Sequence, residues 1–390
     1  MNTRSPDPSA AFLDFNATTP VDPDVLSAML PYFSAEAGNA SSAHAWGRRA
    51  TEAIADARAQ VADAIGASPG SLIFTSGATE SDNLALVGLW RAESMNPRPR
   101  RRVITIATEH KAILEVVRAE LAPNGADVVI LGVDINGAID LAELRDALRT
   151  PTLLVSAMAA NNETGVLMPL RAIADLAHEA GALVHSDAAQ VVGKAAFDVR
   201  DLDIDLASFS AHKMYGPKGI GGLYLAGDVR LEPILRGGGH ERGLRSGTSN
   251  TPSIVGFGLA ARLAKERMGA DTDRMQALRD QLWEQISSVI AGSRRNGPTV
   301  RVLPNTLNVC LPGVDADDLL AATPLLGAAT GSACASGSPE PSHVLLAMGL
   351  SYDEARSSLR FSLGRTTDAA DIDAGLGLLR DGYERVRLAA

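Results

Sequence analysis

Short apolar runs alternate with amphipathic segments along the first two thirds of the chain. The apolar runs are bounded by turn-forming residues and predict buried strands. They cover residues 72–74, 103–106, 128–131, 153–157 and 182–185. Apolar residues three or four positions apart predict helices between several of them, most clearly at 53–65 and 173–180. This alternation predicts an α/β fold with a mostly parallel sheet, in which ligands bind beyond the carboxyl ends of the strands.

The last third of the chain predicts a second unit. A long helix is expected from about residue 253 to 268, and another amphipathic helix contains Leu278, Leu282, Ile286 and Ile290. A strand at 300–311 and a final helix at about 369–388 follow. Because 390 residues exceed one ordinary core, we expect two domains. Their predicted ranges are 15–260 for a large domain and 261–390 for a small one, with 1–14 packing on the small one.

Composition argues against several classes of protein. The net charge of −10 does not suit a general nucleic-acid binder. No stretch approaches the roughly 18 apolar residues of a membrane span, and the N-terminus lacks the apolar core of a secretory signal. Two cysteines, Cys310 and Cys334, do not make a disulfide framework, which suits a reducing compartment. We therefore expect a cytoplasmic protein that binds neither membrane nor nucleic acid directly.

Lys213 occupies the most informative position in the sequence. Before it, Leu202, Ile204 and Leu206 alternate with acidic residues, as in a half-buried strand, and a Gly-rich turn follows it. A lysine in a packed, dry site loses its proton readily and can form a Schiff base, as in enzymes that use pyridoxal phosphate (PLP). The alternative is an ordinary surface lysine at the end of a strand.

Polar residues also follow other predicted strands. Asp187 can pair with a protonated pyridine nitrogen, with Gln190 in reach of a ring hydroxyl, but Asp187 can equally cap a helix. Residues 77–79 open a helix, whose N–H groups and positive dipole end form an anion site. Thr79 and Asp82 also fit a capping box, which is a purely structural role.

Three further residues and one loop have two interpretations each. His110 could stack on a flat ring and exchange protons, or it could be structural. Asn162 could bind a ligand or form a turn. Arg360, inside an apolar strand, could bind a substrate carboxylate or form a salt bridge. The loop at 237–248 could reach a phosphate across a subunit interface or serve as a connector.

The two cysteines lie in different contexts. Cys334 lies in a small, polar segment bounded by glycines, where an exposed thiol can become a nucleophilic thiolate. Cys310 lies in a predicted strand and is interpreted as a small core residue.

Together these segments resemble the cysteine desulfurase family, which is the aminotransferase class V branch of fold-type I PLP enzymes. The resemblance extends from about Phe12 to Leu379, and so many motifs in order are far more specific than any one of them. The spacing from Gly331 to Arg360 resembles the long-loop subgroup (group I). Ala189 departs from the hydroxyl residue that many relatives have there. The motifs lie at 15–20, 75–81, 108–112, 161–165, 210–213, 245–248, 331–334 and 360–362.

The resemblance implies a large, mostly parallel seven-stranded sheet domain with a smaller α/β C-terminal domain, and a homodimer. It implies PLP as the cofactor and no metal. It implies that Lys213 holds PLP, that His110 and Lys213 move protons, and that Thr248 is lent across the dimer interface. The residues implied to bind PLP are Ala78, Thr79, His110, Asn162, Asp187, Gln190, Ser210, His212, Lys213 and Thr248.

The resemblance also implies the reaction. L-cysteine, its carboxylate bound by Asn162 and Arg360, would become L-alanine, and its sulfur would pass to Cys334 as a persulfide. An acceptor protein, such as an iron-sulfur scaffold, would then receive it for iron-sulfur cluster assembly, tRNA thiolation or DNA phosphorothioation. Two alternatives remain: a selenocysteine lyase or other PLP β-eliminase without a protein persulfide, and a sulfur-relay binding protein with little catalysis.

Overall fold

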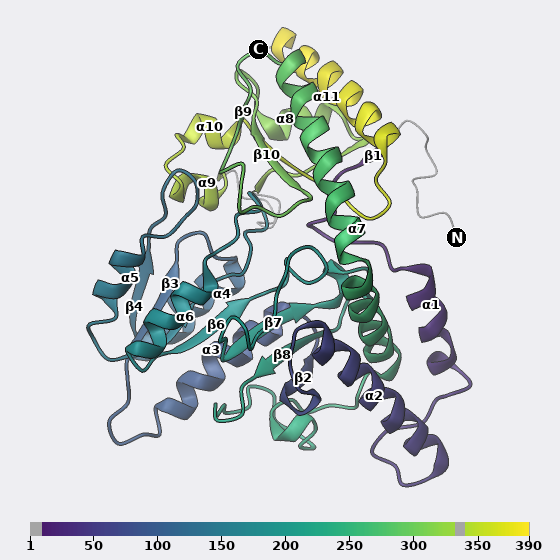
Figure 1. Cartoon of the computed structure of the whole chain (residues 1–390), viewed down its shortest axis with the longest axis vertical. Helices are drawn as coiled ribbons and strands as arrows, with labels where there is room; N and C mark the ends of the chain where they lie inside the picture. Colours follow the sequence, from purple (N-terminus) through teal and green to yellow (C-terminus); the bar gives the residue numbers. More distant parts are fainter. Residues whose placement is uncertain (1–9, 332–339, 390) are drawn as a thin grey trace.

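A twisted seven-stranded sheet forms the centre of the larger part of the molecule (Figure 1). The structure is a computed structural model that describes residues 10–331 and 340–389. The strand order is β2-β8-β7-β6-β5-β3-β4, and only β8 runs antiparallel to its two neighbours. This confirms the predicted α/β fold with its mostly parallel sheet. The strands are β2 (Leu72–Thr75), β3 (Arg102–Ile106), β4 (Asp127–Leu131), β5 (Thr152–Ser156), β6 (Leu183–Asp187), β7 (Leu206–Ser210) and β8 (Gly221–Leu225).

Helices cover both faces of this sheet, because successive side chains of its central strands point to opposite faces. In β3, Ile104 packs in the same core as Ile173 of α6. The preceding residue, Val103, packs with Leu84 of α3 in a separate core. The helices around the sheet are α1 (Pro23–Met29), α2 (Ala45–Ala64), α3 (Ala78–Glu93), α4 (Lys111–Val116), α5 (Leu141–Ala147) and α6 (Leu170–Glu179).

A second layer of structure lies above the sheet in Figure 1. Strand β10 pairs antiparallel with both β9 and β12, and β1 pairs in parallel with β11. A separate core unites Leu13 near the N-terminus with Phe361 and Leu379. The division at residue 260 falls inside helix α7 and stays a prediction. The elements are β1 (Ala11–Phe12), α7 (Thr251–Val289), β9 (Arg294–Arg295), β10 (Thr306–Cys310), α8 (Ala316–Ala322), β11 (Leu326–Gly327), α9 (His343–Ala347), α10 (Tyr352–Arg356), β12 (Ser358–Ser362) and α11 (Ala369–Ala389).

Helix α7 corrects the sequence prediction of two separate helices. It is continuous over 39 residues. Gly269 lies between the two predicted segments, but one glycine costs a helix only about 1 kcal/mol. Both ends are held by packing: Phe257 lies in a core of the sheet layer, and Ile286 lies in the core around Leu13. Tertiary contacts at the two ends therefore outweigh the weak break in the middle.

Two predicted strands begin later than the sequence suggested. The prediction at 202–207 is wrong over its first half, because Asp203 adopts a left-handed φ of 57° and β7 starts at Leu206. The prediction at 300–311 is likewise wrong over its first half, since Arg301 has a φ of 56° and β10 starts at Thr306. Ile204 and Leu303 are buried in these segments although neither lies in a strand. The other five predicted strands lie within two residues of their predicted positions.

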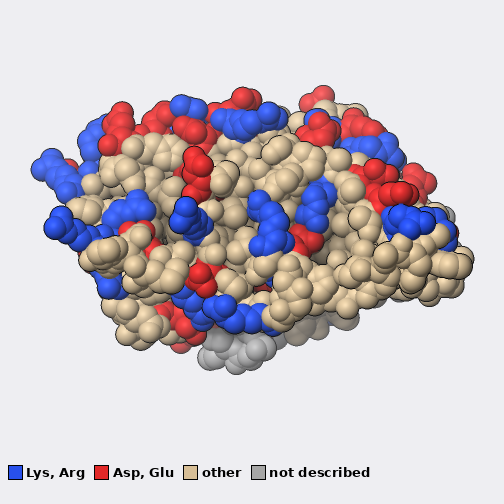
Figure 2. Space-filling model, turned by 90° about the horizontal axis from the view of Figure 1, so that it is seen from below, with Lys and Arg blue, Asp and Glu red and all other residues tan. Residues whose placement is uncertain are grey.

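The surface carries charges of both signs. Figure 2 shows Lys and Arg side chains interspersed with Asp and Glu side chains over the face seen from below. Arg100 pairs with Glu93 and Arg102 with Asp127, so these arginines of the basic cluster 98–102 belong to local ion pairs. In the part of the chain that the structure describes, no helix has the length and apolar character needed to span a bilayer.

Candidate active site

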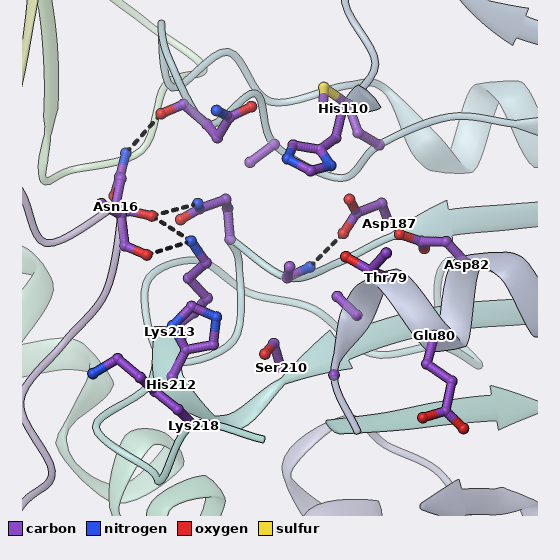
Figure 3. Close-up of a pocket in the computed structure, with 18 of the residues that line it drawn as sticks. Asn16, Thr79, Glu80, Asp82, His110, Asp187, Ser210, His212, Lys213 and Lys218 are labelled. Atoms are coloured by element: carbon purple, nitrogen blue, oxygen red, sulfur yellow. Dashed lines mark hydrogen bonds between the residues drawn. The ribbon is translucent and has the colours of Figure 1, made fainter. Parts of the chain in front are cut away.

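A cavity of about 500 Å³ opens at the carboxyl ends of the parallel strands (Figure 3). That volume is in the usual range for sites that bind small molecules. The structure brings most of the predicted site residues together around it. These lining residues are Ala78, Thr79, His110, Asn162, Asp187, Gln190, Ser210, His212, Lys213 and Arg360.

Lys213 ends a single 3-10 turn, Ala211–Lys213, that follows β7. Its side chain is only half exposed. Its Nζ donates hydrogen bonds to the backbone oxygens of Asn16, at 2.6 Å, and Ala17, at 2.8 Å. The alternative of an ordinary surface lysine is therefore wrong, because two carbonyls from a distant segment hold this amine at the cavity.

Asp187 is the last residue of β6 and is buried at the bottom of the cavity. Its Oδ1 accepts the N–H of Ala189 at 2.9 Å, and a turn rather than a helix follows, so it is no helix cap. Burial raises the pKa of Asp187, while the neighbouring His110 and Lys213 act in the opposite direction. Such a carboxylate gains most from a cationic partner placed in the cavity.

Asp82 lies beside Asp187 in Figure 3 and is 1% exposed. Within residues 10–331 and 340–389, neither of its carboxylate oxygens has a hydrogen-bond partner. Burial and the charge of Asp187 raise the pKa of Asp82 well above its usual range. The predicted capping box with Thr79 is wrong, since α3 has Gly77 at its N-cap and no side-chain cap.

His110 is held by the helix that it begins. It is the N-cap residue of α4, and its Nδ1 accepts the N–H of Ala112 at 3.1 Å. A neutral ring with this contact carries its proton on Nε2. Figure 3 shows the imidazole beside the cavity, on the same side as Asp187. The geometry leaves the ring able to lie against a flat ligand and to exchange a proton at Nε2.

The N-terminus of α3 lines the cavity next to Asp187, where Figure 3 draws Thr79. The N–H of Ser76 donates to Glu80, a residue that also lines the cavity and whose carboxylate pairs with Arg245 at 2.9 Å. The N–H groups of the first turn and the dipole of this 16-residue helix therefore form an anion site beside Ser210. Burial and the charge of Lys213 lower the pKa of the neighbouring His212 to about 4, so its ring is neutral at pH 7.

Arg360 lines the cavity from β12 and forms the salt bridge that was one of its two predicted interpretations, while substrate binding stays a prediction. Its Nη2 donates to Asp14 Oδ1 at 2.6 Å, which is the structural salt bridge. Its Nη1 donates to the backbone oxygen of Asn162 at 3.1 Å. Its buried Nε has no acceptor among the described residues. A guanidinium with one buried donor still to satisfy is suited to a ligand carboxylate.

The family model for "Aminotransferase class-V" matches residues 11–374. The chain is 47% identical over 379 residues to "Cysteine desulfurase IscS" of Anaeromyxobacter sp. (strain Fw109-5), covering 96% of this chain and 93% of the relative. The chain belongs to this family, and within it to the cysteine desulfurases.

Solved structures agree with this assignment. A "NifS-like protein" superposes with a TM-score of 0.88 at 36% identity, covering 97% of this chain and 100% of the other. A structure described as "SspA in complex with cysteine" superposes with a TM-score of 0.79 at 38% identity, covering 90% of this chain and 98% of the other. The fold expected of fold-type I PLP enzymes is thereby confirmed.

Two predicted residues of this cysteine desulfurase need separate mention, because Thr248 is not among the residues that line the cavity and Cys334 is not among the described residues. Thr248 is exposed on the loop 237–248, which is tied to the sheet layer through Glu241 and Arg58 at 2.7 Å. Cys334 lies outside the described residues, although Gly331, three positions before it, lines the cavity. Cys310 is buried in β10, as expected of a core residue.

Asn16 is a site residue that reasoning from the sequence missed. Besides the contact of its backbone oxygen with Lys213, its side chain donates to the backbone oxygen of Asn162 and to Thr306. It is 1% exposed and lines the cavity. Its place in the segment 15–20 was the only available signal, and that signal carries no information on its partners.

Proposed function

We propose that this protein is a PLP-dependent cysteine desulfurase that converts L-cysteine to L-alanine and transfers the sulfur to Cys334. The observation that supports it most is the grouping of Lys213, Asp187, His110 and Arg360 around one cavity. The 47% identity to a relative named as a cysteine desulfurase points to the same reaction.

The residues of the cavity fit PLP in three respects. The uncapped start of α3 suits a phosphate, with Thr79, Ser210 and His212 beside it. The buried Asp187 suits a protonated pyridine nitrogen. The amine of Lys213 suits the aldehyde carbon. When bound, PLP supplies an electron sink for the substrate.

The chain's own residues would perform the remaining work. Arg360 would bind the substrate carboxylate through its Nε and Nη1, and Asn162 would help to orient it. Lys213 would take a proton from the substrate, or return one to it, at its Nζ, the atom that donates to the backbone oxygen of Asn16 in this structure. His110 would give or take a proton at Nε2.

Cys334 would then accept the sulfur. Its thiolate would form an S–S bond with the substrate sulfur as the C–S bond of the substrate breaks. The carbon that loses sulfur would take up a proton and become the methyl group of alanine. Gly331 at the cavity supports this role, because three residues of extended chain reach roughly 10 Å.

We further propose a cytoplasmic homodimer in which each subunit lends Thr248 to the other's cofactor phosphate. The large domain would comprise residues 15–260, and the small domain 261–390. The acceptor would be a protein such as an iron-sulfur scaffold. Exposure of Thr248 on an anchored loop supports the exchange between subunits.

The test is the intact mass of the protein after brief exposure to L-cysteine. A gain of one sulfur is expected in the wild type and in Cys310→Ala, whose cysteine is buried in β10, but not in Cys334→Ala. Alanine formation without any sulfur gain would point instead to a lyase, and a strong preference for L-selenocysteine would identify it. If the wild type gained no sulfur and formed no alanine, the proposed function would be refuted.

A further inference from the structure

Lys194 is a buried lysine that the proposed reaction does not use. It is 6% exposed and follows β6 by one short turn. Its Nζ donates to Gln190 Oε1 at 2.9 Å and to Asn16 Oδ1 at 3.2 Å. None of the Asp or Glu residues that the structure describes forms an ion pair with it. Its partners are thus two neutral amide oxygens.

Burying a lysine among neutral groups is costly, so its presence calls for a physical reason. Burial, together with the positive charges of Lys213 and Arg360, lowers the pKa of Lys194 to about 7. The amine retains at least two N–H donors in either charge state. Its contacts to the two amide oxygens therefore persist whether or not it carries a charge.

These contacts determine which way the Gln190 amide faces. A glutamine amide can turn over and exchange its oxygen and nitrogen, and only its partners decide between the two arrangements. Lys194 offers donors on one side. On the other side the backbone oxygen of Asn16, 3.0 Å from Gln190 Nε2, can only accept. If the amide were reversed, Gln190 Oε1 would face the backbone oxygen of Asn16, and the two oxygens would repel each other.

The side chain of Asn16 is fixed in the same way. Its Oδ1 accepts from Lys194 and, at 3.0 Å, from Asn305. Its Nδ2 donates to Thr306 Oγ1 at 2.8 Å. The backbone oxygen of the same residue accepts from Lys213, so Lys194 supports both the amide and the peptide group against which the reactive amine rests.

We infer that Lys194 is a positioning residue, which holds the Gln190 amide with its NH₂ group toward the cavity, where it donates to the ring oxygen of the cofactor. The inference rests on the proposed binding of PLP. Gln190 lines the cavity, and one of its two N–H groups remains after the bond to Asn16. A donor placed there favours the anionic form of the ring oxygen over the protonated form.

The experiment compares variants loaded with PLP. The readouts are the PLP dissociation constant and the midpoint of the pH titration of the bound cofactor's visible absorbance. Lys194→Met keeps the volume of the side chain but has no donor. It should weaken PLP binding about tenfold and move the titration midpoint by about one pH unit. Each of these two changes corresponds to the free energy of about one hydrogen bond. Gln190→Met should move the midpoint equally, and the double variant no further.

Controls separate this role from others. Lys265→Met removes an exposed lysine paired with Asp63 and should leave both readouts unchanged. Lys194→Gln keeps a donor without the charge and should retain the wild-type midpoint; it also serves as the test if Lys194→Met does not fold. A shifted midpoint in Lys194→Gln would overturn the inference.

Two other results would also overturn it. The first is a Lys194→Met protein with wild-type affinity and midpoint. The second is a double variant whose shifts simply add, because Lys194 would then not act through Gln190. A wild-type protein that binds no PLP would instead refute the proposed function, so the two failures are distinguishable.

Discussion

Asp82→Asn should make the stability of the cofactor-free protein less dependent on pH. Asp82 is buried beside Asp187 and lacks a hydrogen-bond partner among the described residues. Among the described residues, the basic group in ion-pair range is His185, with its Nε2 at 3.6 Å. Burial lowers the pKa of His185 to about 3, so it provides no positive charge at neutral pH. Asp82 therefore retains its proton in the folded protein.

The magnitude follows from linkage between proton binding and folding. Below about pH 4, Asp82 is protonated in both the folded and the unfolded chain and has no effect. Above it, the unfolded chain releases the proton while the folded chain retains it. The free energy of unfolding then falls by about 1.4 kcal/mol per pH unit until the raised pKa is reached. From about pH 5 up to that raised pKa, the wild type should therefore lose stability that Asp82→Asn retains.

The assay is urea unfolding of cofactor-free protein at pH 5, 6 and 7, which gives the free energy of unfolding at each pH. Asp56→Asn, on the exposed side of α2, is the matched control and should behave as the wild type. Glu109 and Asp187 also have raised pKa values, and both are present in every variant. Equal pH slopes for wild type and Asp82→Asn would refute the reasoning.

Three further predictions concern single contacts. Glu241→Ala should lower the free energy of unfolding by about 3 kcal/mol, because it leaves the guanidinium of Arg58 without the carboxylate that binds it at two points. Urea titrations measure this, and an unchanged midpoint of urea unfolding would contradict it. Gly221→Ala should cost about 1–3 kcal/mol and weaken PLP binding, since the added Cβ would lie 2.6 Å from Gly77 Cα at the phosphate site; calorimetry and a PLP titration test both parts. Arg360→Lys should raise KM for L-cysteine about tenfold, with PLP affinity unchanged, because lysine cannot bind a carboxylate at two points; steady-state kinetics would disprove it if KM stayed at the wild-type value.

The polar contacts around Asn16 explain how the two layers of the molecule meet at the cavity. Asn16 contacts Lys213 and Gln190 of the sheet layer as well as Asn305 and Thr306 at the start of β10. Nearly all of its polar groups are satisfied by partners far away in the chain. Buried networks of this kind are rigid when every member is paired. The amine of Lys213 is therefore held by both layers.

Local patterns along the sequence were enough to locate most strands of the large sheet and to indicate which polar residues lie at its edge. The apolar runs located five strands of the large sheet to within two residues. The position of Lys213 after a strand, and of Asp187 after another, placed both at the edge of a parallel sheet. These features were readable because strand and helix periodicities are local, and because the carboxyl ends of parallel strands share one edge.

Which side chains meet, and which local preferences are overruled, depends on how the whole chain packs. Helix α7 continues through Gly269 because packing holds both of its ends. Lys194 bonds to Asn16 across 178 positions of the sequence, and Arg360 to Asp14 across 346. The pattern around a residue specifies its own backbone, but partners so distant in sequence are selected by the packing of the whole fold. The arrangement that gives Lys194 its inferred role therefore exists only in three dimensions.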